Sequence, residues 1–205
     1  MKVNLAATKS NLLKSKKTLA LTHEGYELLD EKRRILINEL NSIIHAAEKL
    51  DEDVDAALRA GYKLVDRATV TMGRKRLEAL SLSIDIKNDL SITQRRVMGV
   101  NIPVIALKVQ ENPPYYSPYD VSLYVDEVIA KFKDIVKLLA QLAEKKIAIL
   151  RLAKEVQKTI RKVNALEKIY IPYYEETVKY ITDRLDEESR EAFSMLKMIK
   201  ERLRN

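Results

Sequence analysis

The 205-residue sequence contains no cysteine and no tryptophan, and only four glycines, five prolines and two histidines. Without cysteine the chain cannot form disulfide bonds, thiolate metal sites or cysteine nucleophiles. A reducing cytoplasm is compatible with this absence. A compact α/β enzyme would need many more turn residues, so the shortage of glycine and proline predicts long uninterrupted elements.

Long apolar runs are also missing. Residues 1–5 contain no apolar core of signal-peptide length, and no window approaches the roughly 18 apolar residues of a membrane span. We therefore expect a cytoplasmic chain without direct membrane insertion.

What the sequence does contain is typical of long helices. Hydrophobic residues make up 46% and charged residues 33%, and Ala, Leu, Ile, Glu, Lys and Arg dominate long stretches. The net charge of +7 is compatible with a nucleic acid, an anionic lipid or an acidic protein as partner. Charge alone does not distinguish among these three.

Two heptad patterns predict a coiled coil. The first runs from Leu5 to Ala57 and is apolar at twelve of sixteen positions, although small or charged residues interrupt its first half. The second runs from Val128 to Ile181 and is apolar at thirteen of sixteen positions. Pro172 lies inside this second helix, where we expect a local bend. The tightest packing of the first helix is therefore expected in the second half of its pattern. The predicted seam residues are Leu36, Leu40, Ile43, Ile149, Val156, Ile160 and Val163.

The middle of the chain has a different pattern. Residues 62–80 predict a short helix, and alternation over 82–87 together with the β-branched run 102–109 predicts a pair of strands. Residues 112–118 contain three prolines and predict a loop. The predicted fold is mainly α, a long antiparallel two-helix coiled coil with a small central head containing a short β-hairpin. Its divisions are an N-terminal helix over 1–60, a head over 61–119 and a C-terminal helix over 120–205.

Motifs for chemistry are absent or incomplete. The sequence has no phosphate-binding loop, and Asp51, Asp53 and Asp55 resemble the start of a calcium loop without its glycine and final glutamate. His23 and His45 are about six helical turns apart and cannot share a metal ion. We therefore predict no catalytic residue, no cofactor and no metal site.

Candidate partner contacts come from charge and from aromatic residues. Residues 1–20 carry five lysines and no acid, and residues 145–162 carry seven basic residues against one acid. These stretches are either solvated flanks of the coiled coil or electrostatic contacts with a partner. The tyrosines of the proline-rich loop either pack on the head or form an interface.

Three segments together resemble the D-subunit family, the central rotor shaft of V-type and A-type rotary ATPases. The opening segment contains Thr8–Lys9, Leu12–Lys14, Leu19, Gly25, Leu28–Leu29 and Lys32–Arg33. The head segment is residues 97–105, which is similar to the family's Met-Gly-Val-x-x-Pro signature. The C-terminal segment contains Arg161–Glu167, Ile171–Pro172, Tyr180–Ile181, Leu185–Glu187, Arg190–Glu191, Phe193, Leu196–Lys197 and Lys200.

The resemblance implies a non-catalytic shaft. Its paired termini would insert into the hexamer of catalytic and regulatory subunits, and its opposite end would hold the small F subunit of the stalk and dock on the socket subunit above the membrane rotor ring. Such a shaft would be peripheral to the membrane. The residues that we expect to contact partners are Lys9, Lys14, Met98, Gly99, Val100, Pro103, Tyr115, Tyr116, Arg190, Lys197 and Lys200. A basic coiled-coil scaffold or a nucleic-acid-binding module is the alternative that periodicity and charge also permit.

Overall fold

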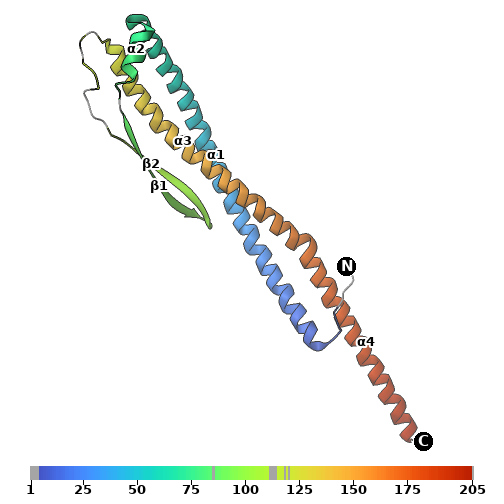
Figure 1. Ribbon diagram of the computed structural model, residues 1–205. Helices are drawn as coiled ribbons and strands as arrows, with labels where there is room; N and C mark the ends of the chain where they lie inside the picture. Colours follow the sequence, from blue (N-terminus) through green and yellow to red (C-terminus); the bar gives the residue numbers. More distant parts are fainter. Residues whose placement is uncertain (1–4, 85, 111–114, 118, 120, 205) are drawn as a thin grey trace. The chain divides into compact units, whose positions relative to one another are not determined.

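The computed structural model describes residues 5–84, 86–110, 115–117, 119 and 121–204. Its elements in chain order (Figure 1) are α1 (Lys9–Met72), α2 (Arg74–Ser81), β1 (Lys87–Val97), β2 (Val100–Gln110), α3 (Leu123–Ala165), the π-helical turn η1 (Leu166–Tyr170) and α4 (Ile171–Arg204). The chain forms two compact units. Unit 1 contains Met1–Ile35 and Val156–Asn205, and unit 2 contains Leu36–Glu155.

Unit 2 pairs the second part of α1 with the first part of α3. Lys146 Nζ lies 2.8 Å from a carboxylate oxygen of Asp51, and Tyr62 packs edge-to-face on Phe132. Since the later residue of α1 contacts the earlier residue of α3, the two helices are antiparallel. Their buried stripes are almost entirely apolar. The buried hydrophobic residues of this unit are Leu36, Ala47, Val54, Ala68, Val100, Ile102, Val125, Ile135, Leu142, Ala148 and Leu152.

Unit 1 pairs the first part of α1 with the end of α3 and with α4. His23 lies 3.9 Å from Glu175 across this pair. The buried polar residues Ser15, Asp30, Thr159 and Thr177 all belong to unit 1, beside the buried apolar residues Val156, Val163 and Ile181. The interrupted first half of the N-terminal heptad pattern predicts looser apolar packing, and the buried residues of α1 agree with this expectation.

The predicted fold class is confirmed, and several element bounds differ from those expected. α1 continues past the expected end near residue 60 to Met72, so the short helix predicted over 62–80 is in part the end of α1. Gly73, with a φ of +81°, then separates α1 from α2. This positive φ interrupts the helical backbone, and glycine adopts it at little steric cost because it has no Cβ.

The hairpin also lies later in the chain than predicted. β1 begins at Lys87, whereas the alternating pattern predicts the first strand over 82–87. The register runs without a bulge from Lys87 opposite Gln110 to Val97 opposite Val100. Met98 and Gly99, with φ of +48° and +83°, form the two-residue turn. Positive φ at both central residues is the feature of a type I′ turn, and this turn determines which residues pair.

The chain around Pro172 is a π-helical turn followed by a helix. Proline has no N–H to donate to the carbonyl four residues earlier. In the structure η1 ends at Tyr170, so the wider turn lies immediately before Ile171 and Pro172. Wider turns of this kind commonly occur where the regular hydrogen-bond ladder is interrupted. Of the predicted proline-rich loop, residues 112–114 and 118 lie outside the described residues.

Two glycines of α1 provide a matched test of helix packing. A Cβ built on Gly61 would lie 3.0 Å from Ile135 Cδ1 and 3.3 Å from Phe132 Cε2, whereas a Cβ on Gly25 would meet nothing within 4 Å. Gly25→Ala should therefore raise the free energy of unfolding by about 0.5–1 kcal/mol, the usual helical gain over glycine. Gly61→Ala should gain less or lose stability, because the side chains of Ile135 and Phe132 must move to make room for the added methyl group. Chemical denaturation followed by circular dichroism would measure both, and an equal gain at both positions would contradict the close contact.

Candidate functional site

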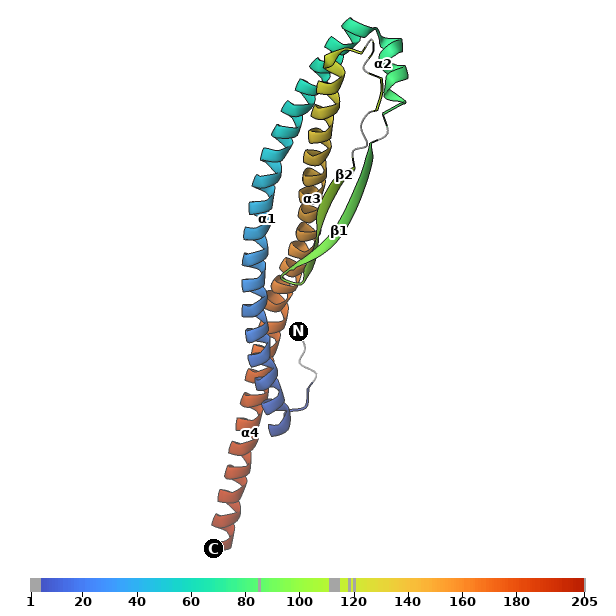
Figure 2. The ribbon, with the colours of Figure 1, turned by 90° about the vertical axis from the view of Figure 1, so that its left-hand side faces the viewer.

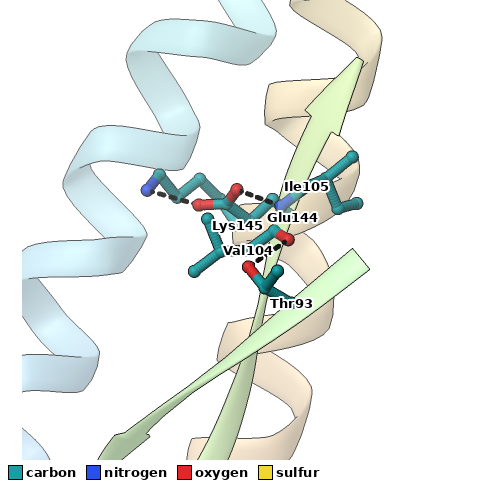
Figure 3. Close-up of polar contacts among 5 residues, drawn as sticks. All are labelled: Thr93, Val104, Ile105, Glu144 and Lys145. Atoms are coloured by element: carbon teal, nitrogen blue, oxygen red, sulfur yellow. Dashed lines mark hydrogen bonds and ion pairs between the residues drawn. The ribbon is translucent and has the colours of Figure 1, made fainter. Parts of the chain in front are cut away.

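The head of the structure is a hairpin fixed to α3. The backbone N–H of Ile105 donates a 2.8 Å hydrogen bond to Glu144, whose other carboxylate oxygen lies 3.1 Å from Lys145 Nζ (Figure 3). Nearer the turn, Arg151 Nη1 donates to the backbone carbonyl of Asn101 at 2.9 Å. Two side chains of α3 therefore hold two backbone positions of β2.

The position of these bonds follows from the strand register. Val97 and Val100 flank the tight turn and exchange backbone hydrogen bonds with each other. From there, every second pair along the hairpin exchanges such bonds. The residues of the pairs in between direct their N–H and C=O groups away from the partner strand. Asn101, Pro103 and Ile105 occupy the outward positions of β2. Pro103 can be accommodated there because its missing N–H would not have bonded to β1.

The signature residues of the head lie at the turn and on the inner strand. Met98 and Gly99 form the turn itself, and the side chain of Met98 is 48% exposed. Val100 and Pro103 are buried. A buried valine and proline pack the hairpin, whereas an exposed methionine at the tip is available to another molecule.

The loop tyrosines are held differently from one another. Tyr115 is half-buried with Lys133 Nζ 5.3 Å from its ring centre, and the hydroxyl of Tyr116 donates a hydrogen bond to Asp126 in the first turn of α3. Burial raises the pKa of Tyr116 to about 12, and both the hydrogen bond and the charge of Asp126 act in the same direction. Tyr119 is 89% exposed. Two of these tyrosines therefore pack on the head, and the third faces solvent.

The predicted seam residues differ in their degree of burial. Leu36, Val156 and Val163 are buried, whereas Leu40, Ile43, Ile149 and Ile160 are half-buried. Four of them belong to unit 2, namely Leu36, Leu40, Ile43 and Ile149, and the other three, Val156, Ile160 and Val163, belong to unit 1.

The predicted basic contacts are all exposed and all belong to unit 1. They are Lys9, Lys14, Arg190, Lys197 and Lys200. Helix α4 continues beyond the first turn of α1 (Figures 1 and 2), and every residue from 186 to 203 is exposed. Phe193, Leu196 and Ile199 are more than half exposed on this segment. The end of α4 therefore presents both apolar and basic side chains.

The contacts of Glu144, Arg151 and Asn101 between α3 and the hairpin are not indicated by the sequence pattern. Glu144 precedes a strongly basic stretch, and Arg151 lies two helical turns later on the same face. This spacing gives α3 a second face that could contact another element, but no local pattern in the sequence indicates that the hairpin lies against that face.

Elsewhere, the described residues offer no arrangement for metal chemistry. No group of three or more His, Cys, Asp or Glu side chains in the described ranges is close enough to hold a metal ion. Asp51 pairs with Lys146, and His45 Nδ1 lies 3.3 Å from Glu48. Within the same ranges, no helix is both long and apolar enough to cross a bilayer.

These features define a helical structural protein with surfaces suited to contacts with other proteins. They are the paired long helices, the hairpin held on one of them and the exposed end of α4. A family model described as the D subunit of ATP synthase matches residues 11–201. The D subunit of the A-type ATP synthase of Thermococcus kodakarensis is 36% identical over 201 residues, which cover 97% of this chain and 94% of the relative. The D subunit of the V-type ATP synthase of Thermotoga neapolitana is 33% identical, with 98% and 99% covered, and its A-type counterpart from Methanobrevibacter smithii is 38% identical, with 94% and 85% covered. The chain belongs to the ATP synthase D-subunit family.

Loss of the Glu144 carboxylate should release the hairpin from α3. Because Glu144 accepts from the Ile105 N–H, Glu144→Ala should increase the hydrogen-exchange rate of this amide several-fold. Glu127→Ala, which changes an exposed carboxylate of the same helix, is the matched control. Amide exchange measured by nuclear magnetic resonance would show the difference. An unchanged Ile105 rate would mean that Glu144 does not hold β2.

The contact of Tyr116 with Asp126 should be visible in an alkaline titration. The folded pKa of about 12 exceeds the ordinary value of 10.0, so the stabilisation from this contact is present below pH 10 and is lost as the pH rises from 10 to 12. The difference in tyrosinate absorbance between the wild type and Tyr116→Phe should titrate near pH 12. Asp126→Asn should lower this midpoint, and Glu127→Gln should not. If this difference instead has its midpoint at the ordinary value of 10.0, Tyr116 is not packed as described.

Proposed function

We propose that this chain is a central-stalk rotor subunit of a V-type or A-type ATPase. It transmits torque between the hexamer that hydrolyses or synthesises ATP and the membrane rotor ring that translocates ions. The observation that carries the proposal is the similarity to the D subunits of ATP synthases over nearly the whole length of both chains. The relatives include both A-type and V-type proteins, so the proposal covers both classes.

The physical properties of the helices support a torque-bearing role. A single helix bends and twists readily, whereas two antiparallel helices that share a buried stripe must deform together. In unit 2 the shared stripe includes the fully buried Leu36 and Leu152 and the nearly buried Ile135. In unit 1 it includes Val163 and Ile181, of which 1% and 0% are exposed. Separating the helices in either unit would expose these side chains, so the packing resists relative movement.

The proposed partners are the catalytic and regulatory subunits of the hexamer, the small F subunit of the stalk and the socket subunit above the rotor ring. The exposed end of α4, with Arg190, Lys197 and Lys200, would contact the hexamer together with Lys9 and Lys14 of α1. The exposed Met98 of the hairpin and the exposed Tyr119 of the loop would serve partners of the head. In this proposal the chain acts in the part of the complex outside the membrane and does not itself hydrolyse ATP.

The alternative of a basic coiled-coil scaffold or a nucleic-acid-binding module rests on periodicity and positive charge. The relatives' names support the stalk subunit instead. Aromatic side chains interleaved with basic residues would favour single-stranded nucleic acid, but the basic segment 1–20 has no aromatic residue.

Opening the seam should uncouple the motor. Val163 is 1% exposed on α3, so Val163→Lys buries an unpaired charge and should destabilise the helix pair by about 3 kcal/mol or more. The adjacent exposed Asn164→Lys adds the same charge and should have little effect. In the purified ATPase complex reconstituted into vesicles, Val163→Lys should lower ion transport per ATP hydrolysed several-fold, whereas Asn164→Lys should not.

Two outcomes would contradict this account. If complexes that retain Val163→Lys, verified by subunit stoichiometry, transport as many ions per ATP as the wild type, the packed seam does not transmit torque. If the wild-type chain does not assemble with the other ATPase subunits, the assignment as a stalk subunit fails.

A further inference from the structure

The core of unit 1 contains a gap. From residue 164 to residue 176 no side chain is buried, although Val163 and Thr177 on either side are 1% and 0% exposed. In the stretch 22–34 of α1, the one buried residue is Asp30, which is charged. A packed heptad seam buries about two residues of each helix in every seven. We call these two stretches, which the structure describes in full, the loose segment; both belong to unit 1.

The two stretches of the loose segment face each other. His23 of α1 lies 3.9 Å from Glu175 of α4, and the two helices run in opposite directions. Seven residues further along α1 is Asp30, and seven residues back from Glu175 is Lys168, at the centre of η1. The buried charge of α1 is therefore about level with the π-helical turn of the facing helix.

The charged residue in this gap does not link the helices. The carboxylate of Asp30 pairs with Arg33 and Arg34 of its own helix. Among the described residues, the buried Nε of Arg33 has no hydrogen-bond partner. Desolvation offsets much of the attraction within a buried ion pair, so such a pair often stabilises a structure less than apolar packing of similar volume. The contact of His23 with Glu175 is long and joins two half-exposed side chains, so it contributes little.

The facing helix is irregular at the same level. None of the five residues of the π-helical turn η1 is buried. Pro172 follows this turn and has no N–H to donate to the carbonyl of Lys168. Helices bend most readily where the hydrogen-bond ladder is interrupted in these ways. Gly25 of α1 gives separate evidence of loose packing, since a Cβ built on it would meet nothing within 4 Å.

We propose that the loose segment is a torsionally compliant section of the chain, at which α1 separates from the facing helix and twists before the rest of unit 1 does. Sections of a rod under the same torque share the twist in proportion to their compliance, so the section with the least packing takes the largest part. Fewer buried apolar contacts also lower the free energy of local opening. The consequence for torque rests on the proposed function, whereas the local opening is a property of the chain itself.

Amide hydrogen exchange of the full chain tests the opening. After correction for intrinsic rates, the amides of residues 22–34 should exchange about tenfold faster or more than those of residues 47–54 in the same helix, where Ala47 and Val54 are buried. Both stretches are regular α-helix, so the π-helical turn of the facing helix does not by itself explain such a difference. Equal exchange in the two stretches would overturn the proposal.

Filling the gap should close the loose segment. In the double variant Asp30→Leu/Arg33→Met, apolar side chains replace the buried ion pair, a change that is often stabilising. The exchange of residues 22–34 and of η1 should then slow about tenfold. Lys17→Met/Glu27→Leu introduces the same side chains at exposed positions of α1 and is the matched control, which should leave these rates unchanged. If the double variant has the helical content of the wild type by circular dichroism and yet exchanges at the wild-type rate, the proposal fails.

Distances between spin labels test the separation of the helices directly. The chain has no cysteine, so labels can be attached at introduced thiols. Glu31→Cys with Glu167→Cys labels exposed positions of the loose segment, and Ala56→Cys with Gln141→Cys labels exposed positions of unit 2, where both helices have buried apolar residues. The distance distribution of the first pair, measured by double electron–electron resonance, should be wider than that of the second, and filling the gap should narrow it. Equal widths of the two distributions would contradict the separation.

The outcome of these measurements is independent of the role of the chain in an ATPase, because they use the isolated protein. If the loose segment opens but the chain does not assemble with the other ATPase subunits, the proposed function fails and the local opening stands. If the chain assembles but the segment exchanges like the rest of α1, only the compliant section is disproved.

Discussion

The burial of one apolar stripe against another is the constraint on which the remaining structure depends. Neither long helix has another surface large enough to cover its stripe, so each unit is held by the antiparallel contact of α1 with α3 or α4. In unit 2 this contact is close enough at Gly61 that a Cβ would meet Ile135 at 3.0 Å. The head is placed secondarily, because β2 is attached to side chains that this pairing leaves accessible on α3.

The two units satisfy the constraint with different chemistry. The buried residues of unit 2 are apolar, whereas unit 1 buries Thr177 and Asp30 in its helix pair. Thr177 donates its hydroxyl proton to the carbonyl of Tyr173 in its own helix at 2.7 Å, and the carboxylate of Asp30 contacts Arg33 and Arg34 of its own helix. These contacts lie within one helix each and do not link the two helices. Apolar contact therefore contributes less per residue to helix pairing in unit 1 than in unit 2.

The sequence motif that carries the family resemblance in the head also determines the structure of the hairpin. Met98 and Gly99 supply the positive φ angles of the turn, and Pro103 occupies a position at which its lack of an N–H costs no hydrogen bond within the hairpin. The next outward N–H, from Ile105, is the one that Glu144 accepts. The same alternation therefore gives one edge of the sheet to α3 and leaves the other edge of β1 open. For a stalk subunit, this arrangement couples the head to α3 while keeping its outer strand accessible.

The sequence alone was sufficient for the paired helices, because heptad periodicity is a local property that survives without knowledge of the partner helix. Through Met98, Gly99 and the segments around them, the sequence also indicated a hairpin and a resemblance to the D-subunit family. It did not determine where β1 begins, because the alternation over 82–87 is as regular as a strand requires, and only the turn at Met98–Gly99 decides that 102–109 pairs with 88–95. It also did not identify Glu144 and Arg151 as the residues that hold the hairpin, since their role depends on which face of α3 remains after α1 has covered the other. The local sequence pattern therefore determined that the long elements are helices. The tertiary structure decided which surfaces of these helices are covered and which remain exposed, because burial depends on how the faces assemble and not on single residues.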